Sequence, residues 1–461
     1  MTVIPEAVRI RSALAGEVAG PLYVPGDPEL ADEISGYNLA VQHEPVIVVG
    51  AIGAADVAAA VRFAGEHDLP VSVLATGHGA VAAEHAVLIT TRRMQHVHID
   101  PGRRLARVGA GVKWEAVIDR AAAHCLAPLV GSTPDAGVVG YTLGGGMPVL
   151  GRTFGWAADQ VTSMEVVTAD GRIRRVDAQH DPDLFWALRG GKGGFGVVTA
   201  MEFSLLPLTE LYGGGVYFDG DHSAAVLHTY RAWVRDLPAA ANSSVALLRL
   251  PDLPFVPAPL RGRLSVHLRY AYIGDAAEGA RLLAPMREAA PALMDTVEIM
   301  PHEAIGSIHN DPTEPMPAWD RGVLLRDLPE EAVDVILRSA GPQADVPLVM
   351  VEIRHLGAAL TAQPIVPNSA GGRAAQFAIT VIGPLPPPLA SIVPAIGNGL
   401  LSSLAPWSAG THANFAGGDS ATENEGQAWD PATYERLQHI KLRYDPADVF
   451  RSGYTVRPPF S

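Results

Sequence analysis

Two glycine-rich segments hold the residues of this chain that are best suited to chemistry. The first is Leu74-Ala-Thr-Gly-His-Gly79, which directly follows a predicted strand. Small residues let the backbone approach a ligand, and consecutive amide N–H groups can bind phosphate oxygens. His78 would then lie against the ligand that carries the phosphates. Taken alone, however, the segment favours a plain strand–loop turn with a solvated histidine.

The second segment is Gly131-Ser-Thr-Pro-Asp-Ala-Gly-Val-Val-Gly-Tyr-Thr-Leu-Gly-Gly-Gly146. It has too many glycines for a strand and too many apolar residues for a linker. A backbone that lies flat against a large planar ligand would need this composition. The alternative is a buried, bulged connection in the core.

Other familiar sequence motifs do not predict a functional site in this chain. Gly191-Lys-Gly-Gly-Phe-Gly196 fits G-x-G-x-x-G, but it follows a predicted helix and precedes a strand, the reverse of the dinucleotide-binding context. We interpret it as a tight turn. No H-E-x-x-H, P-loop or G-x-S-x-G pattern occurs. His96 and His98 have no acidic or cysteine partner at ligand spacing, so no metal site is predicted.

The elements around these segments can be read from hydrophobic spacing. Val46–Val49, a helix over Asp56–His67 and Pro70–Leu74 form a predicted βαβ unit. Further strands are expected at Val87–Thr90, Leu105–Gly109, Met164–Thr168, Ile173–Val176 and Gly196–Leu206, with helices at Lys113–His124 and Asp181–Leu188. Past Pro207 prolines are frequent, and the pattern predicts a second α+β domain with strands at Leu264–Ile273 and Leu348–Leu356 and helices at Ala276–Arg287 and Glu330–Ala340.

Composition limits the classes of protein. The chain has 461 residues, 48% hydrophobic and 18% charged, which is typical of a soluble globular protein of two domains. Its net charge of −15 argues against nucleic acid or an anionic membrane as partner. Cys125 is the single cysteine, so an internal disulfide is excluded, and we expect a cytoplasmic protein with Cys125 as a small buried residue. We read no signal peptide and no apolar run of the ~20 residues that a membrane helix needs.

The combination of motifs is more specific than any one of them. In order along the chain come the 74–79 loop, the 131–146 segment, Asp181-Pro-Asp-Leu-Phe-Trp-Ala-Leu-Arg-Gly-Gly191, Gly194-Phe-Gly-Val-Val-Thr199 and Leu437-Gln-His-Ile-Lys-Leu-Arg-Tyr-Asp-Pro-Ala-Asp-Val-Phe450. This set resembles the FAD-linked oxidases of the vanillyl-alcohol oxidase / p-cresol methylhydroxylase fold. Within them it is most similar to the berberine-bridge-enzyme-like group, which includes bacterial 6-hydroxy-D-nicotine oxidase. The resemblance covers about 37–208 and 410–457.

The resemblance implies an α+β fold. An FAD-binding domain in two parts is expected over 1–206 and a substrate-binding domain, an antiparallel sheet covered by helices, over 207–410. A C-terminal segment over 411–461 would return to the FAD domain. It also implies one covalent bond between His78 and the flavin 8α carbon. Doubly linked relatives have a cysteine where this chain has Thr133 before Pro134, so no second link is expected.

Further cofactor contacts follow from the resemblance. Thr76 and Gly77 would offer amide groups to the pyrophosphate, Ala136 would leave room for O2 near flavin C4a, and Tyr141 would hydrogen-bond the reduced flavin. The residues expected at FAD are Leu74, Ala75, Thr76, Gly77, His78, Gly79, Thr133, Ala136, Gly137, Gly140, Tyr141, Gly144, Gly145, Gly196, Val197, Val198, Asn414 and Tyr454.

No motif identifies the catalytic base. In this fold it is often a Tyr, Glu or Asp of the substrate-domain sheet. Tyr270 and Tyr272 share one strand face, and Glu352 shares another with Arg354. These residues and Tyr141 form the catalytic set, although packing tyrosines and a surface ion pair explain the same pattern.

The resulting expectation is an FAD-dependent oxidase. It would transfer hydride from a C–H beside an OH or NH of a small organic molecule to flavin N5, and O2 would reoxidise the flavin to give H2O2. The alanine-rich composition favours natural-product tailoring as much as catabolism. An isomerase or cyclase that uses FAD without net redox change is the alternative, and a non-enzymatic binding protein is disfavoured by the intact His78. The expected oligomeric state is a monomer or a homodimer.

Overall fold

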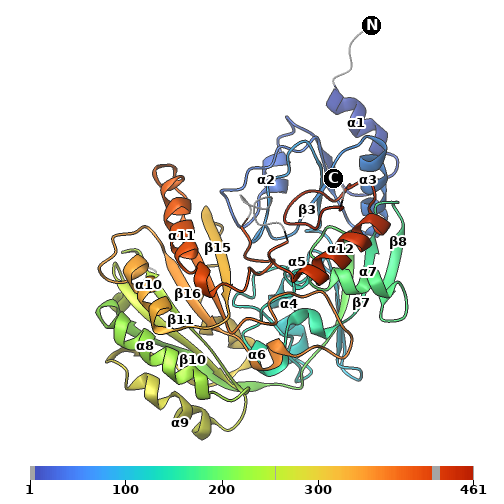
Figure 1. Cartoon of the computed structure of the whole chain (residues 1–461). Coiled ribbons are helices and arrows are strands. Elements are labelled where there is room, and N and C mark those ends of the chain that lie inside the picture. Colours follow the sequence, from blue (N-terminus) through green and yellow to red (C-terminus); the bar gives the residue numbers. More distant parts are fainter. Residues whose placement is uncertain (1–5, 255, 418–425, 460–461) are drawn as a thin grey trace.

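The computed structural model describes residues 6–254, 256–417 and 426–459 and has two lobes (Figure 1). One lobe contains a four-stranded and a five-stranded sheet, and the other contains a single eight-stranded sheet. Within the described residues no helix is both long and apolar enough to cross a membrane. The α+β class expected from the sequence is confirmed.

The four-stranded sheet holds the first glycine-rich loop. Its order is β1-β2-β4-β3, with bounds β1 Leu22–Tyr23, β2 Ile47–Gly50, β3 Val71–Leu74 and β4 Val87–Thr90. Helix α3 (Ala54–Glu66) joins β2 to β3, and its predicted apolar face is buried. The two strands of the predicted βαβ unit are not neighbours, because β4 inserts between them and pairs in parallel with both.

The five-stranded sheet has the order β5-β6-β9-β7-β8. Its strands are β5 Val97–Asp100, β6 Leu105–Gly109, β7 Val161–Val167, β8 Ile173–Asp177 and β9 Val197–Ser204. The hairpin predicted from its turn is β7–β8, paired antiparallel. Helix α4 (Trp114–Ala122) buries Trp114, Val117, Ile118 and Ala121, which is the face that the spacing predicted, and α7 spans Pro182–Leu188.

The second glycine-rich segment contains helical turns that the sequence analysis did not predict. It contains a short helix, α5 (Val138–Leu143), and leads into another, α6 (Gly151–Phe154). The apolar residues Val138, Val139 and Leu143 bury one side of α5, so tertiary packing overrides the low helix propensity of the surrounding glycines.

The eight-stranded sheet is antiparallel throughout. The strands β13-β10-β12-β11-β16-β17-β15 follow one another in this order, and β14 also pairs with β10. The bounds are β10 Glu210–Asp219, β11 Ala241–Arg249, β12 Leu264–Tyr272, β13 Ala292–Asp295, β14 Glu298–Pro301, β15 Ala318–Leu325, β16 Met350–His355 and β17 Phe377–Pro384.

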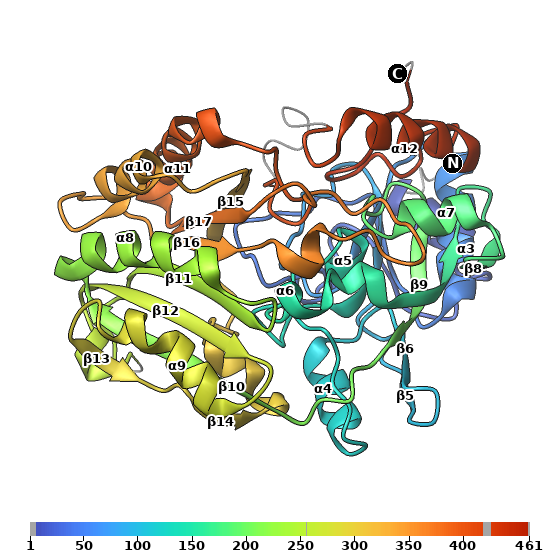
Figure 2. The same ribbon diagram turned by 60° about the horizontal axis from the view of Figure 1, so that its bottom comes forward.

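Helices cover only one face of this sheet (Figure 2). They are α8 Ser223–Trp233, α9 Ala276–Arg287, α10 Glu330–Ala340 and α11 Ile392–Ser403. Leu268 and Tyr270 pack into the core beneath the helices. Their strand neighbours His267 and Arg269 point to the opposite face, because side chains alternate along a strand. That opposite face carries the polar residues of the site.

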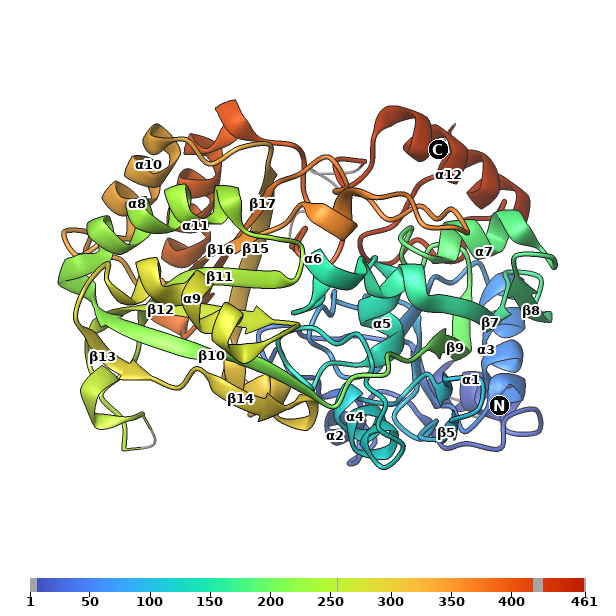
Figure 3. The same cartoon turned by 90° about the horizontal axis from the view of Figure 1, so that it is seen from below.

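The C-terminal helix α12 (Pro431–Tyr444) returns to the first lobe, where it lies beside α7 in Figures 1 and 3. Asp430 caps it by accepting a hydrogen bond from the Thr433 amide at 3.0 Å. Lys441 is fully buried and donates from Nζ to the Gly194 carbonyl at 2.9 Å and to Asp445 at 2.6 Å. One ammonium group therefore holds the C-terminal segment against the 191–196 turn.

We expect Lys441→Met to destabilise the protein by about 3–5 kcal/mol, because it leaves the buried Asp445 carboxylate without its counter-ion. Arg443→Met on the same helix is the control. Its side chain is 64% exposed and 3.6 Å from Asp183, so its loss should cost below about 1 kcal/mol. Denaturant unfolding of both variants measures the difference, and equal losses would contradict this role of Lys441.

Candidate functional site

The loop after β3 presents His78 at the junction of the two lobes. Its ring stacks on Tyr37 with 4.0 Å between ring centroids and an 8° angle between planes. Nδ1 lies 3.1 Å from Oγ1 of Thr76. Nε2 is buried and has no hydrogen-bond partner among the described residues. The imidazole therefore has one nitrogen oriented by the protein and one left for a ligand.

The protonation of His78 is set by its surroundings. Burial lowers the pKa of His78 to about 4, and this outweighs the opposite influence of Asp135, whose carboxylate lies 3.7 Å from Nε2. The side chain is therefore neutral at pH 7. A neutral imidazole nitrogen is a competent nucleophile.

The backbone of this loop fits the role expected for it. Gly77 has φ +79°, and a Cβ there would lie 2.6 Å from Cα of Gly36. The position therefore needs glycine. The amide N–H groups of 76–79 donate to no backbone acceptor in the parts of the chain that are described. They are available to anionic oxygens.

The second segment packs directly on this loop. The amide of Gly137 donates to Oγ1 of Thr76 at 3.3 Å, and a Cβ on Gly137 would be 3.3 Å from Cγ2 of Thr76. The Ala136 amide donates to the Thr133 carbonyl at 3.4 Å, which closes the turn before α5. The structure thus brings Thr76, His78, Thr133, Ala136 and Gly137 into one region.

Three side chains with buried polar atoms lie around the turn that follows α5. The Tyr141 hydroxyl and Oδ1 of Asn414 are both buried and without a hydrogen-bond partner among the described residues. Nδ2 of Asn414 donates to the Tyr141 carbonyl at 2.8 Å. A Cβ on Gly144 would lie 2.0 Å from Oδ1 of Asn414. Unpartnered groups of this kind are costly unless a ligand completes their hydrogen bonds.

His412 is the third of these side chains. Its Nδ1 accepts a hydrogen bond from the Asn414 amide at 3.2 Å, so a neutral ring must carry its proton on Nε2. That N–H is buried and has no acceptor in the described part of the chain. Burial lowers the pKa of His412 to about 3, and the ring stacks on Trp156 with centroids 5.1 Å apart. Sequence reasoning missed His412, although it lies two residues before Asn414.

Other expected cofactor residues lie farther along the first lobe. Gly196 has φ +152°, and a Cβ there would be 2.6 Å from the Val167 carbonyl, so glycine is required where β9 meets β7. Val197 and Val198 are buried at the start of β9. The Tyr454 hydroxyl accepts from the Ala428 amide at 3.2 Å, and its ring stacks on Trp429.

The two tyrosines of the catalytic set lie apart from this region. The Tyr270 hydroxyl donates to the Gly279 carbonyl of α9 at 3.2 Å. Tyr272 also packs against Gly279. Both side chains therefore lie on the helix-covered face of the sheet, opposite to Glu352.

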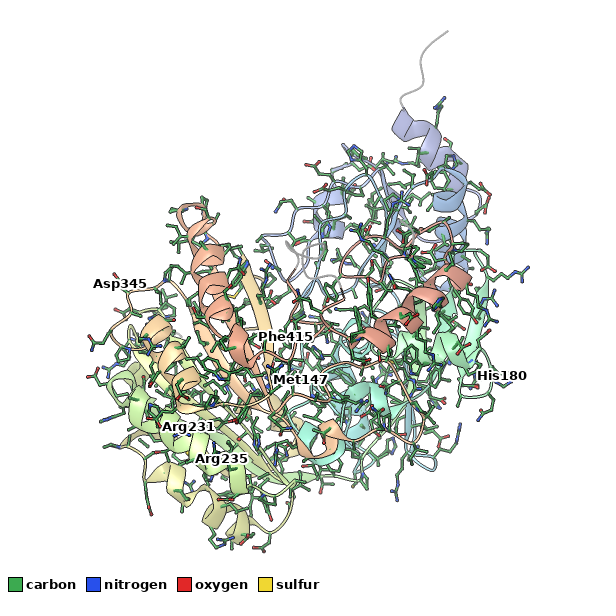
Figure 4. All side chains as sticks on the ribbon, in the orientation of Figure 1. Met147, His180, Arg231, Arg235, Asp345 and Phe415 are labelled. Atoms are coloured by element: carbon green, nitrogen blue, oxygen red, sulfur yellow. The ribbon has the colours of Figure 1, made fainter. Side chains whose placement is uncertain are left out.

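Glu352 lies on the face toward the first lobe. Its carboxylate accepts from Nη1 of Arg269 at 2.8 Å and from Nη2 of Arg354 at 3.1 Å. Arg354 also donates to the carbonyl of Met147 at 3.3 Å, and Met147 lies between the lobes in Figure 4. The sheet residues and the glycine-rich segment are thus connected by hydrogen bonds.

The surroundings shift the pKa values of Glu352 and Tyr141. Burial alone would raise the pKa of Glu352, but Arg354, a hydrogen bond with His309 and Arg269 together hold this pKa well below its ordinary value. The carboxyl is ionised at neutral pH. Burial raises the pKa of the Tyr141 phenol, which stays protonated and therefore has an O–H group to donate.

Cys125 differs from expectation. It is exposed, because it lies in the turn after α4, where its φ of 56° ends the helix. The expectation of a small buried residue is therefore wrong.

We expect Gly144→Ala to displace the Asn414 side chain, because the new Cβ would overlap Oδ1. Loss of one buried hydrogen bond should weaken flavin binding about tenfold. The control is Gly193→Ala, whose Cβ would meet nothing within 4 Å. Both substitutions are made in a His78→Ala background, so that no bond to His78 can retain the flavin, and the flavin absorbance retained per protein after gel filtration measures the loss. Equal retention in both variants would show that Asn414 does not contact the flavin.

Comparisons with known proteins agree with this geometry. An FAD binding domain model matches residues 45–177, and a berberine and berberine-like model matches residues 413–456. The first match contains the His78 loop and the glycine-rich segment, and the second contains Asn414 and α12. Lys441 of the second match donates to the carbonyl of Gly194, which lies beyond the end of the first match.

Two relatives with known names are also FAD-linked oxidoreductases or oxidases. An FAD-linked oxidoreductase of Bacillus subtilis, YvdP, is 25% identical, and the alignment covers 96% of this chain and 99% of that protein. (R)-6-hydroxynicotine oxidase of Paenarthrobacter nicotinovorans is 32% identical over 42% of this chain and 44% of its own length.

A solved structure has the same fold along its whole length. The xylooligosaccharide oxidase of Myceliophthora thermophila superposes on this chain with a TM-score of 0.84 at 19% identity. The superposition covers 98% of this chain and all of that one. The chain therefore contains an FAD-binding domain and a berberine-like C-terminal segment, has the fold of this oxidase, and is an FAD-linked oxidoreductase.

Proposed function

We propose that this oxidoreductase is an oxidase of small organic alcohols or amines. Bound FAD would accept hydride at N5 from a C–H beside an OH or NH, and O2 would take up the electrons to give H2O2. The observation that carries the proposal is His78, a neutral and buried imidazole whose Nε2 has no partner among the described residues. The names of the relatives support both substrate types, since one is a nicotine oxidase and another oxidises a xylooligosaccharide.

We further propose that His78 forms the only covalent link to FAD. Thr133 cannot form a thioether, and Cys125 is exposed in the turn after α4. The remaining expected contacts would bind the cofactor without covalent bonds, through the amide groups of 76–79 and the buried groups of Tyr141, His412 and Asn414. Ala136, with its small side chain, would leave space for O2.

The proposed proton acceptor is Glu352, because it is the one member of the catalytic set that is both ionised and on the face toward the first lobe. Tyr141 would stay protonated and donate a hydrogen bond. Tyr270 and Tyr272 are less suitable, since their side chains lie on the helix-covered face. The proposed domains span residues 1–206, 207–410 and 411–461. We also propose that the enzyme takes part in natural-product tailoring and is located in the cytoplasm.

Anaerobic addition of substrate tests the redox reaction. We expect a substrate found by screening alcohols and amines to bleach the visible flavin absorbance, and admission of air to restore it with release of one H2O2 per substrate. Product formation without bleaching would contradict the oxidase and favour a cyclase or isomerase.

The covalent link has its own test. His78→Ala should abolish the FAD adduct in intact-mass spectra, whereas His98→Ala, an exposed histidine, should retain it. Because the pKa of His78 is about 4, the imidazole stays neutral from pH 8 down to pH 5, and the rate of adduct formation by apoprotein should be constant over that range and fall near pH 4. A fall near pH 6.5 would indicate an ordinary solvated histidine.

A further inference from the structure

The side chain of Asp135 lies beside the nitrogen of His78 that has no hydrogen-bond partner. Its Oδ2 is 3.7 Å from Nε2 of His78, and this oxygen accepts no hydrogen bond from a described residue. The other oxygen, Oδ1, is paired with the ammonium group of Lys113. The Asp135 side chain is 16% exposed, so solvent reaches it only in part. One carboxylate oxygen next to the imidazole is therefore free to accept a proton.

The hydrogen bonds around His78 favour one tautomer of its neutral ring. Oγ1 of Thr76 accepts from the Gly137 amide at 3.3 Å and has a second lone pair for an N–H on Nδ1 of His78, 3.1 Å away. A proton on Nε2 would have no acceptor within hydrogen-bond distance among the described residues. The ring therefore carries its proton on Nδ1, and Nε2 keeps the lone pair that can form a bond to carbon.

Neighbouring contacts hold both side chains in place. Tyr37 stacks on the ring of His78, and the Tyr37 amide donates to the Thr76 carbonyl at 2.8 Å. The Asp135 amide donates to Oγ1 of Thr133 at 3.3 Å. The nucleophilic nitrogen and the free carboxylate oxygen thus have a fixed separation. Fixed positions of this kind contribute strongly to the rates of reactions between groups held together.

We infer that Asp135 removes a proton from the flavin 8-methyl group when Nε2 of His78 bonds to the carbon of that group. The inference rests on the proposed function, because it names the base for the proposed covalent link. A carboxylate is a competent general base when it lies close to the proton that it removes. The pair of Asp135 with Lys113 uses only Oδ1, so Oδ2 is the atom assigned to this step.

The step balances as follows in atoms and electrons. One C–H bond of the 8-methyl group breaks, its proton goes to Oδ2 of Asp135, and its electron pair passes into the flavin ring. The bond between Nε2 of His78 and the 8α carbon forms, and the ring, now reduced by two electrons, takes one proton from solvent. O2, the oxidant of the proposed function, accepts the two electrons, the ring proton and the Nδ1 proton to give H2O2. Asp135 then returns its proton to solvent.

Adduct formation by the full-length apoprotein tests this base. After FAD is added, intact-mass spectra follow the covalent adduct with time. Asp135→Asn has the same size and should still bind FAD, but should form the adduct at least about a hundredfold more slowly, because a general base contributes a factor of about this size or more. Asp119→Asn, which removes an exposed carboxylate from α4, should react at the wild-type rate. A wild-type rate in Asp135→Asn would overturn the inference.

Hydrogen exchange distinguishes a base from a residue that only positions His78. The His78→Ala variant cannot form the bond, but Asp135 can still remove and return the methyl proton. FAD released from this variant after incubation in D2O should therefore contain deuterium in its 8-methyl group. Adding Asp135→Asn should slow this exchange at least about tenfold, and adding Asp119→Asn should not. Equal exchange with and without the Asp135 carboxylate contradicts its role as a base.

The bonding atom and a second variant complete the test. NMR spectra of the flavin peptide from the wild-type adduct should show the bond at Nε2, and a bond at Nδ1 would refute the assigned geometry. If Asp135→Asn does not fold, Asp135→Glu decides in its place. It moves the carboxylate by one methylene group and should slow adduct formation at least about tenfold, because small misplacements of a reacting group are costly. An unchanged rate in Asp135→Glu would then overturn the inference.

Failure of this inference can be distinguished from failure of the proposed function. If the adduct forms at the wild-type rate in Asp135→Asn, only the role of Asp135 is wrong. If the wild-type protein binds FAD without any adduct, the covalent link and the role of Asp135 are both wrong. The oxidase reaction is then still decided by bleaching of the bound flavin.

Discussion

Desolvation is the physical constraint on which the site depends. Tyr141, His412 and Asn414 each bury a polar atom that has no partner among the described residues, and His78 does the same in the neighbouring loop. Each such atom costs free energy in the folded protein unless something bonds to it. Four of them around two glycine-rich segments are best explained by one extended ligand with several polar atoms. The glycines matter because side chains at Gly77 and Gly144 would fill the space.

Buried polar side chains also connect the two lobes. Polar residues on the open face of the eight-stranded sheet bond to backbone of the first lobe, as Arg354 does to Met147 and Arg152 does in the opposite direction to Ala241 and Leu237. These long side chains cross the junction and have few rotamers once they are bonded. The junction is therefore fixed by hydrogen bonds to carbonyl groups. Lys441 does the same for the C-terminal segment.

Much of the fold could be predicted from local pattern. The buried face of α4, the β7–β8 hairpin and the bounds of α9 follow from spacing and turn residues, because these depend on neighbours close in sequence. The insertion of β4 between β2 and β3, the helix α5 inside the glycine-rich segment and the exposure of Cys125 could not. Each is decided by contacts between distant residues, which one sequence does not display.

The candidate site likewise has one part that the sequence predicted and one part that it could not predict. The sequence alone determined the loop that carries His78, the glycines beside it and the motif order that predicts an FAD-linked oxidoreductase, because these are contiguous residues in a fixed order. Only the tertiary structure decided that Tyr270 and Tyr272 face the helices while Glu352 faces the first lobe, and that Nε2 of His412 is buried without a hydrogen-bond partner among the described residues. Burial and charge pairing arise when strands and loops far apart in the chain come together, and they set which side chains can bind or exchange a proton.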